Sequence, residues 1–285
     1  MEENTIAAQL KLATEKLKDA EVDSPRLDAE VLLAYVLHCR RLALYVKLKK
    51  VLTAEQITRY QNLIKRRLER IPVAYLTGHK EFMGLNFAVT PDVLIPRPDT
   101  EVLAQGVIEN LYKFNRKIKI ADLGTGSGAI CVSILKFAEN VTAAAVDISK
   151  KALDIAHFNA EKFNVDDKIT FYEGNLFEPL AGQTFEVIVS NPPYVSTADF
   201  KNLQPEIENE PEIALEGGAD GLNFYRKIVE AAPKFLSDDG FLAMELGFKQ
   251  SPAVKKLIED NGNFKQIEIW KDLAGIERVI AAWKK

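Results

Sequence analysis

The tetrapeptide Asn191-Pro192-Pro193-Tyr194, called the Asn-Pro-Pro-Tyr loop below, has residue types suited to chemistry on a planar nitrogen. It follows the apolar run 185–190, which predicts a buried strand. The two prolines end this strand, because neither can donate a backbone hydrogen bond. Ligands of open α/β sheets bind at the carboxyl ends of strands, so we expect a pocket there. The asparagine amide and the tyrosine face would hold a flat amide or amidine still; the alternative is an ordinary strand-ending turn.

A second candidate site is the glycine loop, residues 122–128, with the sequence D-L-G-T-G-S-G. Glycines allow a tight turn and a close approach to a ligand, and the helix that follows offers free N–H groups. Asp147 ends the next predicted strand, where its carboxylate would accept both hydroxyls of a ribose. We therefore assign to cofactor binding Gly124, Thr125, Gly126, Ser127, Gly128 and Asp147.

The identity of the cofactor has two candidates. The loop and Asp147 also satisfy the loose dinucleotide fingerprint G-x-G-x-x-A. S-adenosylmethionine is favoured over NAD for two reasons. The loop is dense in glycine, with the acidic Asp122 before its glycines, and the Asn-Pro-Pro-Tyr loop has no role in hydride transfer. Asn175 and Leu176 follow the third strand and would meet the adenine, by its edge and its face respectively, with Phe177 as the alternative to Leu176. Asn191 also borders this cofactor site.

The elements that position these residues alternate between strand and helix from residue 118 onward, which predicts an α/β fold with a parallel sheet and helices on both faces. The last two strands, 266–270 and 278–283, are joined by a short turn that permits only an antiparallel pair. The sheet should therefore be mixed at one edge. The other predicted strands are 118–122, 141–147, 169–172, 185–190 and 241–245, and the helices are 102–112, 129–137, 151–163, 222–236 and 254–259.

The first 75 residues show helical periodicity only. Thr5, Ser24 before Pro25, and a capping box at Thr53 predict three helix starts. The helix after Thr53 has a basic face, which we interpret as solvated; the alternative is a docking surface for a ribonucleoprotein or a partner protein. Its members are Arg59, Lys65, Arg66, Arg67 and Arg70. Strands at 82–89 and 93–95 would then form a β-hairpin linker.

Bulk properties exclude several classes of protein. The net charge of -4 and the isoelectric point near 5.6 give no global basic field for nucleic acid. The longest apolar runs are too short to span a bilayer, and the acidic start is unlike a signal peptide. Cys39 and Cys131 are expected to be free thiols in a reducing cytoplasm. The three histidines show no metal-ligand spacing, so we predict no metal site.

Three motifs together resemble the PrmC/HemK family of protein-(glutamine-N5) methyltransferases: the glycine loop, the Asn-Pro-Pro-Tyr loop and I-P-R-P-D-T-E at 95–101. The segments 72–78, 217–222 and 272–278 are also similar to the family. The resemblance implies a helical substrate-docking domain at 1–78, a hairpin linker at 79–96 and a methyltransferase domain at 97–285. That last domain would be a Rossmann-like class I fold with a seven-stranded mixed sheet. Many related enzymes carry Asp where this chain has Asn175, which weakens the assignment of its adenine contact.

The implied substrate is the glutamine of the Gly-Gly-Gln motif in class I peptide chain release factors, with S-adenosylhomocysteine as the second product. In our hypothesis Asn191 Oδ1 and the Pro192 carbonyl accept the two amide hydrogens, Pro193 stiffens the loop, and the Tyr194 ring packs on the amide or the sulfonium. Alignment and charge stabilisation suffice, without a general base. We expect a monomer that acts in the cytoplasm on neither DNA nor membranes. Arg97, Thr100 and Glu101 match the family signature, with packing of the linker as their simplest interpretation.

Three other functions share parts of this pattern. A DNA adenine methyltransferase must flip a base and bind a phosphate backbone, yet the segment after Tyr194 is short and acidic. A non-catalytic binding module would not need an intact Asn191, Tyr194 and glycine loop. A methyltransferase for another protein glutamine, such as one in a ribosomal protein, would carry the same signature, with the helical segment selecting the target.

Overall fold

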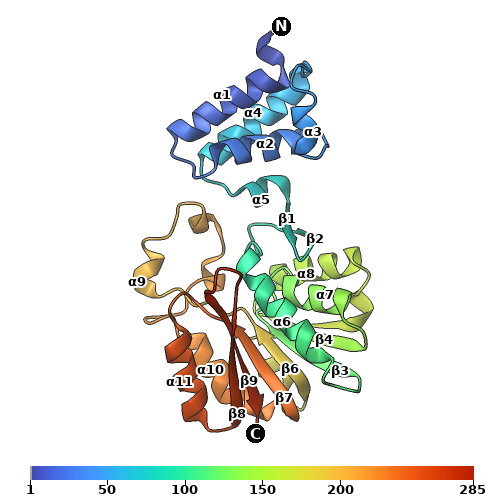
Figure 1. Cartoon of the computed structure of the whole chain (residues 1–285), viewed down its shortest axis with the longest axis vertical. Coiled ribbons are helices and arrows are strands. Elements are labelled where there is room, and N and C mark those ends of the chain that lie inside the picture. The colour runs from blue at the N-terminus through green and yellow to red at the C-terminus, as the bar shows by residue number, and fades with distance from the viewer. Residues whose placement is uncertain (1) are drawn as a thin grey trace. The chain divides into compact units, whose positions relative to one another are not determined.

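The computed structural model describes residues 2–285, which form two compact units (Figure 1). Unit 1 is the chain up to His79 together with Gln204–Asn209. Unit 2 comprises Lys80–Leu203 and Glu210–Lys285. A short segment that follows the Asn-Pro-Pro-Tyr loop therefore belongs to the helical unit. Within the described residues, no helix has the length and apolar character needed to cross a membrane.

Unit 1 is built from helices, as predicted. Their bounds are η1 Glu2–Asn4, α1 Ile6–Asp19, α2 Pro25–Val36, α3 Leu42–Tyr45, α4 Ala54–Leu68 and α5 Val73–Thr77. The Thr5 hydroxyl accepts a hydrogen bond from the Ala8 backbone at 3.3 Å, and the capping box of Thr53 with Gln56 is present. Ser24 precedes α2 as predicted, but its side chain makes no capping hydrogen bond. The apolar sides of α1, α2 and α4 meet in one core.

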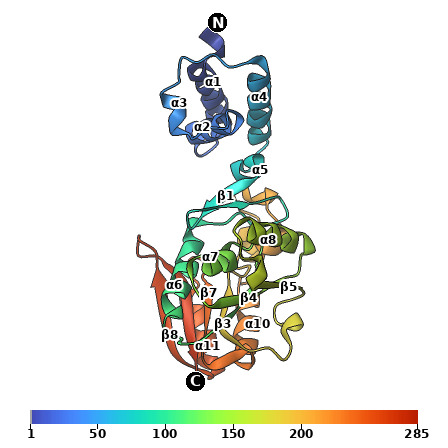
Figure 2. The same ribbon diagram turned by 90° about the vertical axis from the view of Figure 1, so that its right-hand side faces the viewer.

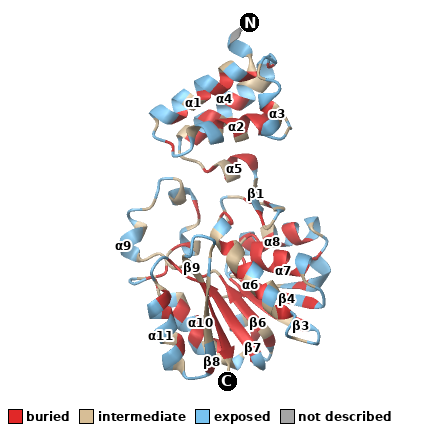
Figure 3. Ribbon diagram, in the orientation of Figure 1, coloured by how far each residue is buried: buried red, intermediate tan, exposed pale blue. Residues whose placement is uncertain are grey.

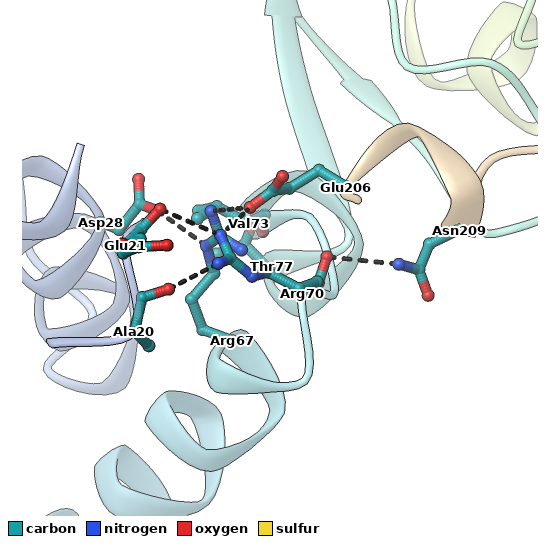
Figure 4. Close-up of polar contacts among 9 residues, drawn as sticks. All are labelled: Ala20, Glu21, Asp28, Arg67, Arg70, Val73, Thr77, Glu206 and Asn209. Carbon is teal, nitrogen blue, oxygen red and sulfur yellow. Dashed lines mark hydrogen bonds and ion pairs between the residues drawn. The ribbon is translucent and has the colours of Figure 1, made fainter. Parts of the chain in front are cut away.

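The basic face of α4 is only partly solvated. Exposed members are Arg59, Lys65 and Arg66. Arg67 is buried, with 5% of its surface exposed, so the solvated interpretation is wrong for this residue. Its Nε donates to Asp28 Oδ2 and its Nη2 to Glu206 Oε1, both at 2.8 Å (Figure 4). Arg70 is half-buried and donates to the same Glu206 oxygen at 3.3 Å.

The hairpin that follows lies earlier in the chain than expected, because a turn at Met83 and Gly84 divides the predicted strand 82–89. Its strands are β1 His79–Phe82 and β2 Leu85–Ala88, and residues 93–95 form no strand, contrary to the prediction. The turn residues Met83 and Gly84 have φ of 52° and 74°. Positive φ at both central residues is typical of the tight two-residue hairpin turn, which pairs the chain with itself before residue 93 is reached.

Unit 2 contains a seven-stranded sheet in the order β5-β4-β3-β6-β7-β9-β8. The strands from β5 to β7 are parallel, whereas β9 is antiparallel to both β7 and β8. The mixed edge that the short final turn predicted is therefore confirmed. The strand bounds are β3 Ile118–Leu123, β4 Val141–Asp147, β5 Ile169–Glu173, β6 Phe185–Ser190, β7 Leu236–Glu245, β8 Phe264–Lys271 and β9 Glu277–Lys284.

Helices cover both faces of this sheet (Figures 1 and 2), and the strands form the buried layer in Figure 3. One core joins the sheet to α6 Glu101–Leu111, α7 Ala129–Phe137 and α8 Lys150–Lys162. The other joins it to α10 Asn223–Ala231 and α11 Ser251–Asn261. The short α9 Thr197–Phe200 lies in the segment after the Asn-Pro-Pro-Tyr loop. α10 ends earlier than predicted and β7 begins earlier, because Pro233 lacks the N–H that a longer helix needs.

Candidate active site

A cavity of about 310 Å³ lies in unit 2, at the carboxyl ends of β3, β4 and β6. It brings together eight of the residues predicted from the sequence: Gly124, Gly126, Asp147, Asn175, Leu176, Asn191, Pro192 and Pro193. Four other predicted residues do not line it: Thr125, Ser127, Gly128 and Tyr194. The glycine loop and the Asn-Pro-Pro-Tyr loop thus border one space, as the order of the strands requires.

The glycines of the glycine loop have two different tasks. Gly124, Gly126 and Gly128 all have positive φ, between 54° and 78°. A Cβ at Gly124 or Gly126 would meet no atom within 4 Å, and both residues line the cavity, so a ligand can approach the bare backbone. A Cβ at Gly128 would instead lie 3.2 Å from the Ala156 Cβ of α8. Gly128 therefore allows helix packing, and the first two glycines leave room for the ligand.

Asp147 at the end of β4 is held by backbone N–H groups. Its Oδ2 accepts from Gly126 and its Oδ1 from Ser149, each at 2.9 Å. Burial raises the pKa of the carboxyl, and these hydrogen bonds oppose the rise. Each oxygen keeps a second lone pair, so the carboxylate can also accept the two hydroxyls of a ribose.

Thr125 acts inside the loop. Its hydroxyl donates to Asp122 Oδ2 at 2.7 Å, and Asp122 is fully buried. The other oxygen, Oδ1, has no hydrogen-bond partner among the described residues, and burial raises the pKa of this carboxyl to about 6. The Thr125 hydroxyl therefore fixes the glycine loop to the buried carboxyl of Asp122 at the end of β3.

The turn after β5 contributes Asn175 and Leu176 to the cavity wall. Asn175 Nδ2 donates to Glu178 Oε1 at 3.3 Å, which leaves the amide oxygen of Asn175 free to accept. Leu176 has a φ of 51°, an unusual value for a residue with a side chain. Phe177 turns away and stacks on Phe235, with ring centroids 4.6 Å apart. Leu176, and not Phe177, is therefore placed to cover a flat ligand.

The Asn-Pro-Pro-Tyr loop presents two acceptors. Asn191 Nδ2 donates to Thr100 Oγ1 at 3.3 Å. Among residues 2–285, no donor bonds to Asn191 Oδ1 or to the Pro192 carbonyl, and both residues line the cavity. The preceding strand end is fixed, because the Ser190 hydroxyl donates to the Leu123 carbonyl at 2.7 Å. The arrangement can therefore hold a group with two N–H donors.

Tyr194 lies behind the cavity instead of lining it. Its hydroxyl donates to Glu245 Oε1 at 3.2 Å, and its carbonyl accepts from Gln250 Nε2 at 2.9 Å. Burial, followed by the nearby Glu245 charge, raises the Tyr194 pKa above its usual range. A Cβ at Gly221 would lie 2.3 Å from the Tyr194 carbonyl oxygen, and one at Gly247 3.0 Å from its ring. These glycines admit the loop, which gives part of the segment 217–222 a packing role.

Sequence reasoning missed two glutamates at the site. Glu210 is buried, accepts from the Ile95 backbone at 3.1 Å and pairs with Arg97. The residues that follow it, Pro211, Ile213 and Ala214, line the cavity, so Arg97 holds part of the cavity wall in place. No local pattern could reveal this pair, because its members are 113 residues apart.

Glu245 is the second missed glutamate and ends β7 with 2% of its surface exposed. Burial raises its pKa to about 7, while hydrogen bonds from Thr100 and Tyr194 oppose the rise. A signal did exist: an acidic residue follows the apolar run 241–244, at a strand end where ligands bind.

Comparisons with known proteins show the family to which this chain belongs. Residues 8–78 match the PrmC N-terminal domain, and residues 99–218 match the methyltransferase small domain. A release factor glutamine methyltransferase from Geobacter sulfurreducens is 43% identical over 265 residues, which cover 93% of this chain and 91% of that protein. A protein of the same name from Moorella thermoacetica is 39% identical and covers 99% of both chains.

This chain belongs to the release factor glutamine methyltransferase family. Solved structures of more distant proteins share its fold. A methyltransferase from Pyrococcus furiosus superposes with a TM-score of 0.52 at 20% identity, covering 79% of this chain and 98% of that one. The 16S rRNA N2 G1207 methyltransferase of T. thermophilus, solved with AdoMet and guanosine, superposes with a TM-score of 0.53 at 18% identity. It covers 73% of this chain and 50% of its own. The predicted class I methyltransferase fold is confirmed.

Proposed function

We propose that this protein transfers a methyl group from S-adenosylmethionine to a release factor. The acceptor is the side-chain amide nitrogen of the glutamine in the Gly-Gly-Gln motif of class I peptide chain release factors. The observation that carries the proposal is a single cavity, which the glycine loop and Asp147 line together with two free acceptors at Asn191 and Pro192. Membership of a family whose curated members are named release factor glutamine methyltransferases supports the choice of substrate.

The lining residues fit S-adenosylmethionine. The open backbone at Gly124 and Gly126 admits the methionine part, and the Asp147 carboxylate has lone pairs for the ribose. Leu176 and Asn175 offer a face and an acceptor for the adenine. When bound, this cofactor supplies an activated methyl group on a sulfonium, which needs no further activation by the protein.

The protein's own task is to hold the nitrogen. A carboxamide nitrogen is a poor nucleophile, because its lone pair is delocalised into the carbonyl. Asn191 Oδ1 and the Pro192 carbonyl accept its two hydrogens and fix its orientation. As the nitrogen becomes cationic, the same two dipoles stabilise the developing charge without reorganisation. The extra proton then leaves to water, since a protonated amide is a strong acid. Contact of the Tyr194 ring with the substrate stays a prediction.

Mass spectrometry of a full-length release factor, incubated with this protein and isotope-labelled S-adenosylmethionine, tests the proposal. We expect one labelled methyl on the glutamine of Gly-Gly-Gln. Asn191→Ala should lower the rate to below about 1% of wild type, with cofactor affinity within about tenfold. The matched control is Asn202→Ala, an exposed asparagine eleven positions further along the chain, which should retain full activity. Methylation of duplex DNA or of a ribosomal-protein glutamine, with none on the release factor, would overturn the proposal.

A further inference from the structure

A buried carboxylate that the proposed reaction does not use lies behind the Asn-Pro-Pro-Tyr loop. Glu245 accepts the Tyr194 hydroxyl on Oε1 at 3.2 Å, and the neighbouring Thr100 hydroxyl, as a hydrogen-bond donor, lowers the pKa of this carboxyl. Its Oε2 is enclosed and has no hydrogen-bond partner in the part of the chain that the structure describes. Glu245 is therefore a strong acceptor with spare capacity, surrounded by hydroxyl groups.

Thr100 connects this carboxylate to the residue that holds the substrate. It is 4% exposed, and its Oγ1 accepts from Asn191 Nδ2 at 3.3 Å. A hydroxyl has a single proton, so while Thr100 accepts from Asn191 its own proton is available for Glu245. The Asn191 amide thus donates to the Thr100 hydroxyl, whose own proton can be directed to the neighbouring Glu245 carboxylate in a series of two hydrogen bonds. An ionised carboxylate can only accept, which fixes the direction of the series.

We propose that Glu245 is a positioning residue that sets which atom of the Asn191 amide faces the substrate. The inference rests on the proposed function and deepens it. With a carboxylate at the end of the series, Thr100 must donate to Glu245 and accept from Asn191. Nδ2 of Asn191 is then directed to Thr100, and Oδ1 remains for the N–H of the substrate amide.

A donor in place of the carboxylate would reverse the series. Thr100 would then accept from residue 245 and donate to Asn191 Oδ1. The Asn191 amide would turn over and present its NH2 to the NH2 of the substrate, where two donors meet and no hydrogen bond forms. Transfer slows although the cavity keeps its shape, because an acceptor of the developing charge is lost.

Protonation of Glu245 has the same consequence, since a carboxylic acid carries a donor. Besides Thr100 and Tyr194, three groups face it. Asp99 raises its pKa, Arg278 lowers it, and the Tyr225 hydroxyl donates to its backbone carbonyl at 2.8 Å. Arg278 is itself paired with Asp99 at 2.9 Å, so it does not neutralise Glu245 fully. With burial raising the Glu245 pKa to about 7, transfer should weaken as the pH falls from about 8 to 6.

Steady-state kinetics of the full-length protein on a full-length release factor test the inference. Glu245→Gln is isosteric and adds a donor, so we expect kcat to fall by about tenfold to a hundredfold, with the dissociation constant of S-adenosylmethionine within about twofold. The wild-type loss of kcat at low pH should be absent in this variant. Glu186→Gln is the matched control. The Glu186 carboxylate accepts a hydrogen bond from the Lys119 backbone N–H at 2.7 Å, and the same change of glutamate to glutamine there should leave kcat unchanged.

Variants of Thr100 separate positioning from structural support. Thr100→Val should lower kcat as Glu245→Gln does, whereas Thr100→Ser should keep most of the wild-type kcat. The double variant Thr100→Val with Glu245→Gln should have a kcat little below that of either single variant. If Glu245→Gln fails to fold, the contrast between Val and Ser decides. Loss in Tyr194→Phe but not in Thr100→Val would overturn the inference, as would a Glu245→Gln kcat within twofold of wild type. No methyl transfer by the wild type would instead overturn the proposed function, and the inference with it.

Discussion

The interiors of the two units each contain a buried charge, and the two charges are treated in opposite ways. Arg67 in unit 1 is 5% exposed and donates to two carboxylates, those of Asp28 and Glu206 (Figure 4). Glu245 in unit 2 is 2% exposed and is met by hydroxyl groups, with one oxygen lacking any hydrogen-bond partner within residues 2–285. Arg67 is neutralised by two carboxylates, although its Nη1 also has no hydrogen-bond partner among the described residues, whereas Glu245 is bonded to a neutral hydroxyl and keeps an unused acceptor.

The difference separates a structural charge from a functional one. Around Arg67, the Glu206 pKa is lowered by the arginine, although burial keeps the Asp28 pKa raised. Around Glu245, burial dominates and raises the pKa to about 7. The charges of a buried ion pair already neutralise each other, so they interact little with a ligand. Removing either partner destabilises the protein, because the other charge is left buried and unpaired. A carboxyl that titrates near neutral pH beside a ligand cavity is instead a candidate for a role in the reaction.

The largest effect is expected from Arg67→Met, which leaves Asp28 without its cation and Glu206 with Arg70 alone. We expect the free energy of unfolding of unit 1 to fall by about 3–5 kcal/mol. Both tryptophans of the chain, Trp270 and Trp283, lie in unit 2, so their fluorescence does not follow this change. Hydrogen exchange of peptides from α1, α2 and α4 measures it directly.

Arg66→Met is the matched control, because Arg66 is exposed and adjacent on the same helix. It should change stability by less than about 0.5 kcal/mol. Binding of S-adenosylmethionine by unit 2 should be the same in both variants. A weaker cofactor affinity in Arg67→Met alone would contradict the structural role assigned to this charge.

Local rules predicted the elements well. The helix at 129–137 and the strands at 141–147 and 185–190 agree with α7, β4 and β6 at both ends, since glycine, proline and apolar runs mark their boundaries. The glycine loop and the Asn-Pro-Pro-Tyr loop were also visible, because each is a dense motif at a strand end. Strand order then placed them at one cavity.

Contacts between distant segments were not predictable in this way. Arg67 appeared to belong to a solvated basic face, and the carboxylate of Glu206 that covers it lies 139 residues away. Thr100 had packing of the linker as its simplest interpretation, yet its hydroxyl accepts a hydrogen bond from the Asn191 amide. In both cases a polar residue takes its partner from a segment that only the tertiary fold brings near, and helical periodicity contains no information about it.

A second, smaller effect concerns the stability of unit 2. The Glu245 carboxyl ionises near pH 4.5 when unfolded and near 7 when folded, so the folded state binds the proton more tightly. Stability is therefore lost as the pH rises from about 4.5 to 7, by up to about 3 kcal/mol. Glu245→Gln removes this cost. We expect it to unfold at higher urea concentration than wild type at pH 8, and at a similar concentration at pH 5, by tryptophan fluorescence.

The opposite signs of two measurements make this prediction sharp. Glu245→Gln should gain stability at pH 8 and lose methyl transfer, which is the trade-off expected of a functional buried charge. If the variant is less stable than wild type at pH 8, the Glu245 carboxylate stabilises the fold, and the distinction between a functional Glu245 and a structural Arg67 is wrong.

The smallest effect is expected from Glu206→Gln, because Arg67 keeps Asp28 as a partner. We expect a loss of about 1 kcal/mol in unit 1 at pH 7. The Glu206 pKa is lowered from 4.5 in the folded state, so its contribution is complete above pH 4.5 and disappears as the pH falls through the lowered value. Hydrogen exchange of α4 at pH 7, and at the lowest pH where unit 1 stays folded, measures the contribution of Glu206 when it is ionised and when it is protonated.

Glu208→Gln is the matched control, because Glu208 lies in the same segment but is exposed and has no ion pair in the described residues. It should have no effect at either pH. A loss in Glu206→Gln as large as that in Arg67→Met would mean that Asp28 contributes nothing, and the buried charge of unit 1 would then be a single pair.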